Sequence, residues 1–418
     1  MQTTEPSQPT FVPVSYWQHT SPQLSLSNAL PSTVDVLVVG SGLFGAATAY
    51  WLARAGKKVA LVDRVGIAYG ASGRNGGFVV AGMHEDYPAA VKRLGQRVAR
   101  AVLEVSYANQ AILRQVLEEE EIACHYREPG SLGLALGEEQ ALEVRQSIEA
   151  LNADGFPVQW LERAEVQKLI YTPLGSEIVG AKFLPGQALV HSARLIQGLV
   201  QAAQRHGAHI YQARVLSLMQ EGGSVRVETS SGNIHAGAVV LAVNAWTSEL
   251  IPEMHEIIVP VRGQILAYAP LAPVFTTAIF ASLTETEEYW QQTLDGSLIL
   301  GGCRALAPGK DVGVWDTSTT QEVQTALEHI LPRLFPQLSG LQVTQRWAGL
   351  MDFTPDRIPL VDRVPGLDNA WFVGGLSGHG MPFGMLLGQY LAQAVQANKD
   401  PEALWPFKLE RETLKNYL

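Results

Sequence analysis

The sequence carries a glycine-rich turn of a kind that binds phosphates. Gly40-Ser41-Gly42-Leu43-Phe44-Gly45 fits the pattern G-x-G-x-x-G, whose glycines allow a tight turn and let backbone N–H groups approach a pyrophosphate. Asp63 follows 18 residues after Gly45, where a carboxylate can accept hydrogen bonds from ribose hydroxyls. The turn and Asp63 together predict a dinucleotide site, although Asp63 by itself could be a helix cap or a surface charge.

A second run of small residues extends from Gly66 to Gly77, just after Asp63. A backbone so rich in glycine can lie flush against a flat cofactor, and Ser72 and Asn75 offer hydrogen bonds. A nicotinamide enzyme does not need such a segment, so the run favours FAD. An NAD(P)-dependent dehydrogenase shares the first turn and stays an alternative.

Five other side chains have two open interpretations each. His379 lies in a glycine-rich turn and could be catalytic or structural. Arg304 follows a predicted strand and could hold a carboxylate or lie on the surface. Tyr268, Tyr289 and Trp290 could line an apolar amine pocket or fill the core.

Composition excludes several classes of protein. A chain of 418 residues with 47% hydrophobic and 17% charged residues is expected to fold as two globular domains. The net charge of −10 argues against sequence-independent nucleic-acid binding. No apolar run approaches the roughly 18 residues of a membrane helix, and the first 31 residues lack the basic and apolar regions of a signal peptide.

The cysteines and histidines do not suggest a metal site. Cys124 and Cys303 have no metal-ligand spacing, and we expect two free thiols in a reducing compartment, the cytoplasm. His206 and His209 have a His-x-x-His spacing, but they fall at a helix end without a nearby pair of carboxylates. No metal is therefore predicted.

Hydrophobic periodicity indicates the elements that must position these residues. Strands are expected at 34–39, 58–62, 225–229, 234–236, 238–243, 297–300 and 370–374. Helices are expected at 43–55, 89–121, 189–206, 321–335 and 384–398. The first strand, helix and second strand flank the glycine-rich turn as a βαβ nucleotide-binding unit requires.

Several motifs, in this order, carry a resemblance to a known family. They are Gly70-Ala71-Ser72-Gly73-Arg74-Asn75-Gly76-Gly77, Trp347-Ala348-Gly349-Leu350, Thr354-Pro355-Asp356, and Gly375-Leu376-Ser377-Gly378-His379-Gly380. The chain resembles the D-amino acid oxidase/glycine oxidase superfamily of FAD-dependent oxidoreductases over roughly residues 34–394. Within it, the chain is most similar to γ-glutamylputrescine oxidase-like and sarcosine oxidase-like members.

The resemblance implies an α/β fold of two domains, a Rossmann-like FAD-binding domain and an α+β substrate domain with an antiparallel sheet. The FAD-binding domain would comprise residues 32–88, 186–250 and 340–400, and the substrate domain residues 89–185 and 251–339. Residues 1–31 would form an N-terminal arm, and residues 401–418 a C-terminal tail.

The resemblance also assigns roles to residues. His379, Arg304 and Met351 would face the substrate. Noncovalent FAD would contact the turn, the small-residue run and the later motifs: Gly40, Gly42, Leu43, Phe44, Gly45, Asp63, Arg64, Ala71, Ser72, Arg74, Asn75, Gly76, Gly77, Val215, Asn244, Trp246, Gly349, Gly375, Gly378, His379, Gly380 and Met381.

Four positions depart from the family pattern. Met351 replaces an arginine, and Pro382 a lysine, with which relatives hold a substrate carboxylate. Gly349 replaces the cysteine that attaches FAD covalently in sarcosine oxidases, and Ile299 replaces the lysine that activates oxygen. Small α-amino acids thus become less favoured as substrates, and attachment through Gly349 is impossible.

The sequence thus predicts FAD-dependent oxidation of an amine or amino acid C–N bond. A hydride would pass to flavin N5, and the imine product would hydrolyse to a carbonyl compound. The electron acceptor would be O2 or another oxidant. A flavin-binding subunit without catalysis is a further alternative.

Overall fold

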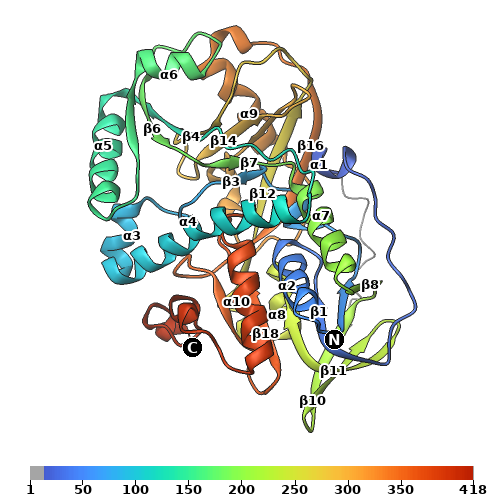
Figure 1. Cartoon of the computed structure of the whole chain (residues 1–418). Helices are drawn as coiled ribbons and strands as arrows, with labels where there is room; N and C mark the ends of the chain where they lie inside the picture. Colours follow the sequence, from blue (N-terminus) through green and yellow to red (C-terminus); the bar gives the residue numbers. More distant parts are fainter. Residues whose placement is uncertain (1–13, 418) are drawn as a thin grey trace.

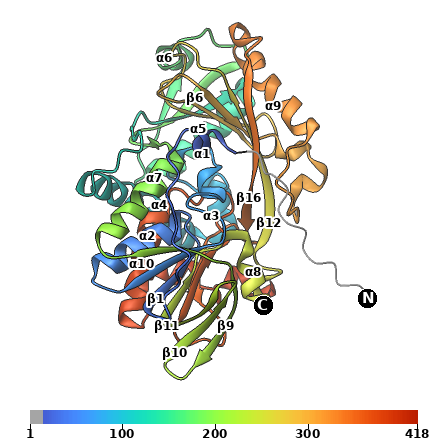
Figure 2. The same ribbon diagram turned by 90° about the vertical axis from the view of Figure 1, so that its right-hand side faces the viewer.

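The computed structural model describes residues 14–417 (Figures 1 and 2). Among these residues, strands form two eight-stranded sheets and one two-stranded sheet. The first large sheet and its helices make the lower half of Figure 1, and the second makes the upper half. This is the two-part α/β architecture that the sequence predicted.

The first sheet contains the predicted nucleotide-binding unit. Its central strands are parallel and apolar, as expected for strands covered on both faces. The strand order is β17 (Leu360–Arg363), β18 (Ala370–Gly374), β11 (Gly232–Leu241), β1 (Thr33–Val39), β2 (Val59–Asp63), β8 (His209–Gln212), with β10 (Ser224–Thr229) paired to β11 and β9 (Val215–Glu221) to β10.

Three helices pack together beside this sheet (Figure 1): α2 (Leu43–Arg54), α7 (Ser192–Arg205) and α10 (Gly384–Ala397). Small residues let α2 and α10 approach closely, since a Cβ added at Gly388 would lie 2.7 Å from the Cβ of Ala47. The close packing fixes α2, whose N-terminus follows the glycine-rich turn.

The second sheet is antiparallel except for one parallel pair, β4 with β13. Helix α9 (Gln321–Leu334) packs along its side (Figure 2). The strand order is β16 (Val343–Phe353), β12 (Val259–Tyr268), β15 (Leu298–Gly301), β14 (Glu288–Gln292), β13 (Ala278–Ala281), β4 (Ser131–Leu136), β6 (Ile178–Leu184), β5 (Gln159–Glu162).

The remaining elements lie outside the two large sheets. They are the helices α1 (Tyr16–His19), α3 (Tyr87–Leu94), α4 (Gln96–Glu119), α5 (Gly137–Ala153), α6 (Arg163–Leu169) and α8 (Thr247–Leu250), and the strands β3 (Phe78–Val79) and β7 (Ala188–Leu189). Short 3₁₀ turns include η1 (Ala71–Gly73). Of the predicted arm and tail, residues 1–13 and 418 lie outside the described residues.

Three sequence-based expectations need correction or qualification. The helix expected at 89–121 is two helices, α3 and α4, because Gly95 adopts φ +80° between them. The strands expected at 234–236 and 238–243 are one strand, β11. Strand β16 lies in the range assigned to the FAD-binding domain, yet it pairs with β12 in the second sheet. The division into domains stays a prediction.

Two features are absent from the described residues. No helix within residues 14–417 is both long and apolar enough to cross a bilayer. Over the same range, no three His, Cys, Asp or Glu side chains gather as a metal site would require.

Gly45 tests how tightly the turn packs on α2. A Cβ at Gly45 would lie 1.8 Å from the carbonyl oxygen of Gly40, a backbone atom that cannot move freely. We expect Gly45→Ala to lower the free energy of unfolding by about 1–3 kcal/mol, despite alanine's higher helix propensity. Thermal denaturation of the apo-protein measures this.

The matched control is Gly223→Ala, because a Cβ there meets no atom within 4 Å. The control should stay within about 0.5 kcal/mol of the wild type. Equal stability of the two variants would mean that the turn and helix are not in close contact.

Candidate functional site

One cavity of about 850 Å³ is lined by residues from both large sheets. One part of its wall contains the glycine-rich turn and Asp63, and another contains Arg304 and Tyr289. The cavity thus connects the predicted dinucleotide site with the predicted substrate pocket.

Asp63 fixes the position of the glycine-rich turn through hydrogen bonds from Ser41. The backbone N–H and the hydroxyl of Ser41 each donate to Asp63 Oδ2 at 2.8 Å, and the N–H groups of Val65 and Gly66 donate to Oδ1. Asp63 still lines the cavity and retains acceptor capacity for a ribose hydroxyl. The first-turn N–H groups of α2 have no intrahelical acceptors and suit a phosphate.

The segment Ala68–Gly77, here called the cofactor segment, is fixed by side chains from distant strands. Trp347 Nε1 donates to the Arg74 carbonyl at 2.8 Å, and Arg74 Nη1 donates to the Ala348 carbonyl at 3.0 Å. Gln291 Nε2 donates to the Gly76 carbonyl at 2.5 Å. Ser72 Oγ accepts from the Leu43 N–H at 2.9 Å, so the segment is also tied to α2.

The third glycine-rich segment, Gly374–Gly380, is pinned to β16 by Asp352. The N–H groups of Gly375 and Leu376 donate to its carboxylate at 2.6 and 3.1 Å. Asp352 is only 1% exposed, and burial raises its pKa to about 7, although these donors oppose the shift. Asp352 therefore sets the path of the loop that carries His379.

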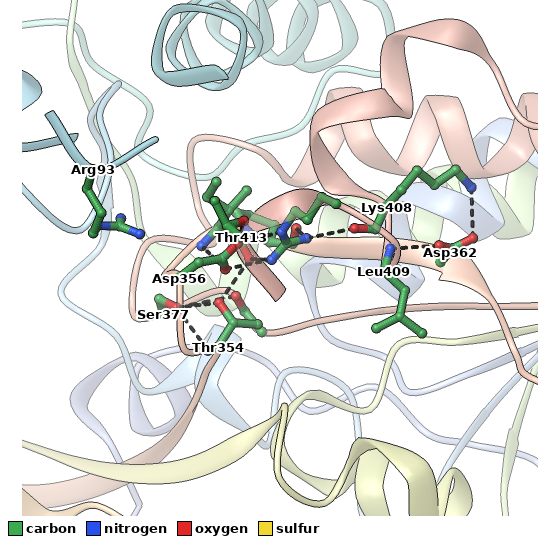
Figure 3. A network of polar contacts seen from close by, with 12 residues as sticks. Arg93, Thr354, Asp356, Asp362, Ser377, Lys408, Leu409 and Thr413 are labelled. Carbon is green, nitrogen blue, oxygen red and sulfur yellow. Dashed lines mark hydrogen bonds and ion pairs between the residues drawn. The ribbon is translucent and has the colours of Figure 1, made fainter. Parts of the chain in front are cut away.

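The motif Thr354-Pro355-Asp356 connects this region to the C-terminal tail (Figure 3). Arg411 donates to both carboxylate oxygens of Asp356, at 2.6 and 2.7 Å, and the Thr413 hydroxyl donates to Oδ2. Burial opposes ionisation of Asp356, but Arg411 and Thr413 outweigh it and hold its pKa below the usual value. The tail thus supports the wall of the site, a role that the sequence did not indicate.

Most residues predicted to contact FAD do lie on the cavity wall. Three do not, because each glycine faces protein: Gly45 faces the Gly40 carbonyl, Gly77 faces Gln291 and Trp17, and Gly375 faces Thr354. Those on the wall are Gly40, Gly42, Leu43, Phe44, Asp63, Arg64, Ala71, Ser72, Arg74, Asn75, Gly76, Val215, Asn244, Trp246, Gly349, Gly378, His379, Gly380 and Met381.

The substrate part of the wall holds two arginines. Arg304 is half-buried, lies 5.3 Å from the ring centre of Phe353, and donates to the Lys310 carbonyl. Burial lowers its pKa, and the charge of Arg357 adds to this effect. Arg357 also lines the cavity. Within residues 14–417, neither guanidinium has a carboxylate at ion-pair distance, so the pair suits an anionic ligand group.

Two histidines lie beside these arginines. The rings of His84 and His379 are 5.8 Å apart. Burial lowers the pKa of His84 to about 3 and that of His379 to about 4, and Arg357 and Arg304 contribute at His84. His379 Nδ1 is buried without a hydrogen-bond partner among the described residues. Both rings are therefore neutral near pH 7.

The structure divides Tyr268, Tyr289 and Trp290 between the two interpretations that the sequence left open. Tyr268 and Trp290 are 2% and 0% exposed and belong to the core under the second sheet, so they do not line an amine pocket. Tyr289 does line the cavity, together with Phe280 and Phe353. Successive residues of β14 point to opposite faces of the sheet, which separates Tyr289 from Trp290.

The other residues singled out from the sequence lie partly on the cavity wall and partly in the core. Met351 and Pro382 both line the cavity, with the Met351 sulfur close to Gly378. Ile299 is buried in the core. Cys124 and Cys303 are buried free thiols, and neither lines the cavity.

The charged or titratable cavity residues that sequence reasoning missed include His84, Arg357 and Glu287. Glu287 lies between β13 and β14 with φ +42°, a strained backbone for a residue with a side chain. No ion-pair partner of Glu287 lies among the described residues, whereas the nearby Asp86 pairs with Lys182 at 3.1 Å. No local motif marks any of the three.

Comparisons with known proteins identify the family of this chain. The family model DAO, described as FAD dependent oxidoreductase, matches residues 35–394. The probable oxidoreductase OrdL of Haemophilus influenzae is 28% identical, over 86% of this chain and 82% of that protein. The γ-glutamylputrescine oxidoreductase of Escherichia coli is 26% identical, over 88% of this chain and 85% of that protein.

A solved structure shares the fold. Glycine oxidase from Geobacillus kaustophilus superposes with a TM-score of 0.78 at 24% identity, over 91% of this chain and all of that chain. The predicted superfamily, fold class and FAD cofactor are thus confirmed, and the nicotinamide alternative is set aside. Contacts of individual residues with FAD stay a prediction.

Gly42 tests the cofactor part of the cavity. A Cβ at Gly42 would lie 2.9 Å from Ser72 Oγ, so a larger side chain would displace Ser72 and project into the space for the pyrophosphate. We expect Gly42→Val to purify folded but without bound flavin, as measured by visible absorbance and circular dichroism.

Gly66→Ala is the control, since a Cβ there meets no atom within 4 Å; it should keep its flavin. Wild-type flavin content in Gly42→Val would show that this turn does not bind the cofactor.

Proposed function

The chain belongs to the DAO family of FAD-dependent oxidoreductases, and we propose that it oxidises the C–N bond of an extended amine or amino acid bearing a carboxylate. The observation that carries this proposal is the pair Arg304 and Arg357, which face the cavity without a carboxylate partner among the described residues. A substrate carboxylate would complete their hydrogen bonding.

The cofactor and the protein would contribute different parts of the reaction. Bound FAD supplies the acceptor for a hydride from the carbon that bears the amine. Arg304 and Arg357 would orient the substrate through its carboxylate. His84 and His379, neutral because of burial, would add no positive charge that repels a substrate ammonium. The imine would be released and hydrolysed to a carbonyl compound and ammonia or an amine.

The departures from relatives support a substrate larger than glycine or sarcosine. Met351 and Pro382 are uncharged where relatives hold the carboxylate, so the carboxylate would bind at the arginines instead. A longer chain would gain affinity by burying apolar surface against Phe280, Tyr289 and Phe353, at about 25 cal/mol per Å². Glu287, on the same wall, would favour a second ammonium group over a second anion.

Noncovalent attachment of FAD and cytoplasmic location remain predictions. Noncovalent attachment is supported by the position of the cysteines, because neither Cys124 nor Cys303 lines the cavity. A flavin-binding subunit without catalysis is the remaining rival, and the experiment below distinguishes it.

The test is anaerobic bleaching of the bound flavin by a panel of amines. We expect extended amines with a carboxylate to reduce the flavin much faster than glycine or sarcosine. Each arginine contributes a charge-assisted hydrogen bond of about 1.5–3 kcal/mol. Arg304→Ala and Arg357→Ala should therefore each lower kcat/KM by about 10- to 150-fold.

The control is Arg226→Ala, which removes a partly exposed arginine of β10 that pairs with Glu221 of β9 and does not line the cavity; its kinetics should match the wild type. If glycine or sarcosine is the best substrate and stays so in both variants, the carboxylate site is wrong. A flavin that no amine bleaches would instead indicate the non-catalytic subunit.

A further inference from the structure

The short helix α1 lies against the cofactor segment Ala68–Gly77 and supplies hydrogen-bond donors to its backbone. Trp17 Nε1 donates to the Asn75 carbonyl at 2.6 Å, and the Ser15 hydroxyl donates to the Gly73 carbonyl. Gln18 Nε2 donates to two carbonyls, those of Ala68 at 3.0 Å and Tyr69 at 2.8 Å. Three side chains among residues 15–18 thus donate to four carbonyls of the segment.

The orientation of the Gln18 amide follows from its second role. Its Oε1 accepts the Ser15 N–H at 3.1 Å, and Ser15 Oγ accepts the Gln18 N–H at 3.1 Å, which forms a capping box at the start of α1. Because the oxygen must face the Ser15 N–H, the NH2 group must face the two carbonyls. The capping box therefore orients the Gln18 NH2 group toward the carbonyls of Ala68 and Tyr69.

On its other side α1 is anchored to α7. Thr20 Oγ1 lies 3.0 Å from His191 Nε2, and Arg194 Nη2 donates to the Thr20 carbonyl at 3.1 Å. The Trp17 ring packs edge-on against His191 with centroids 5.0 Å apart, and Trp17 is only 1% exposed. The donors on α1 are thus held in place by a helix outside the cofactor segment.

The cofactor segment is rich in glycine and therefore depends on hydrogen bonds to its backbone for its order. Glycines at 70, 73, 76 and 77 give the segment a flexible backbone in the unfolded state. The face that it turns to the cavity must stay free of side chains. A Cβ at Gly77 would lie 2.9 Å from Trp17 Cζ2. The tryptophan thus closely packs on the segment and leaves its cavity face open.

We propose that Ser15, Trp17 and Gln18 are positioning residues that hold the cofactor segment in its FAD-binding conformation before FAD arrives. Only molecules in which the segment is ordered can bind FAD, so a smaller ordered fraction raises the apparent Kd of FAD. Removing these donors lowers that fraction. The proposal depends on the FAD binding of the family, not on the substrate proposed above.

The test is titration of the apo-protein with FAD, followed by flavin fluorescence. Trp17→Phe keeps an aromatic ring and removes the N–H. Gln18→Met keeps the side-chain length and removes both donors together with the Oε1 acceptor of the capping box. Each variant should raise the Kd of FAD by about ten-fold. At saturating FAD, kcat should return to the wild-type value, because the donors do not touch substrate.

Hydrogen exchange of the apo-protein gives a second readout. The N–H groups of Gly73 and Arg74, bonded to the carbonyls of Gly70 and Ala71, should exchange faster in both variants, whereas those of α9 should not change. Tyr16→Phe is the matched control on the same helix, because the Tyr16 hydroxyl contacts Thr293 and not the segment. It should leave both Kd and exchange unchanged.

Two outcomes would overturn the proposal. In the first, both variants lower the melting temperature but bind FAD as tightly as the wild type, so α1 only stabilises the fold. In the second, Kd and exchange at Gly73 and Arg74 are unchanged. Because Gln18→Met retains the Trp17 ring, it tests the proposal even if Trp17→Phe fails to fold.

Discussion

The structure depends on satisfying the backbone of glycine-rich segments that must lie bare against the cavity. Such segments offer few side chains for packing, yet a buried carbonyl or N–H without a partner is costly. The partners come from far along the chain: Asp63 and Asp352 accept N–H groups, while Trp347, Gln291 and residues of α1 donate to carbonyls. Both sheets and both ends of the chain thus converge on one cavity wall.

The cofactor part and the substrate part of the cavity differ in their charged groups. The cofactor part combines glycine-rich backbone with larger side chains such as Arg64 and Trp246, and its Asp63 already accepts hydrogen bonds from Ser41, Val65 and Gly66. The substrate part keeps Arg304 and Arg357 without carboxylates, beside two histidines that burial holds neutral. Unpaired like charges close together cost free energy in the empty protein, and an anionic ligand group would relieve that cost. The hydride transfer proposed above needs orientation more than a strong base, which matches this arrangement.

The sequence predicted the nucleotide-binding unit well because its signals are local. A turn between an apolar strand and an alanine-rich helix can be recognised within thirty residues, and β1, α2 and β2 lie where expected. Residues brought together by tertiary structure were not predictable in this way. His84 and Arg357 have no motif around them. Pocket and core stayed open for both Tyr289 and Trp290, because periodicity does not say which face of β14 meets the cavity. Arg411 lies in a tail without periodicity.

The most direct test of the account compares one extended amine with its carboxamide. The carboxylate should be several carbons from the reacting nitrogen, so that the amide changes the charge but not the basicity of the amine. In anaerobic single-turnover experiments at low substrate, the acid should reduce the bound flavin at least about ten-fold faster than the amide. Equal rates, or a faster amide, would contradict the claim that this cavity binds its substrate through a carboxylate.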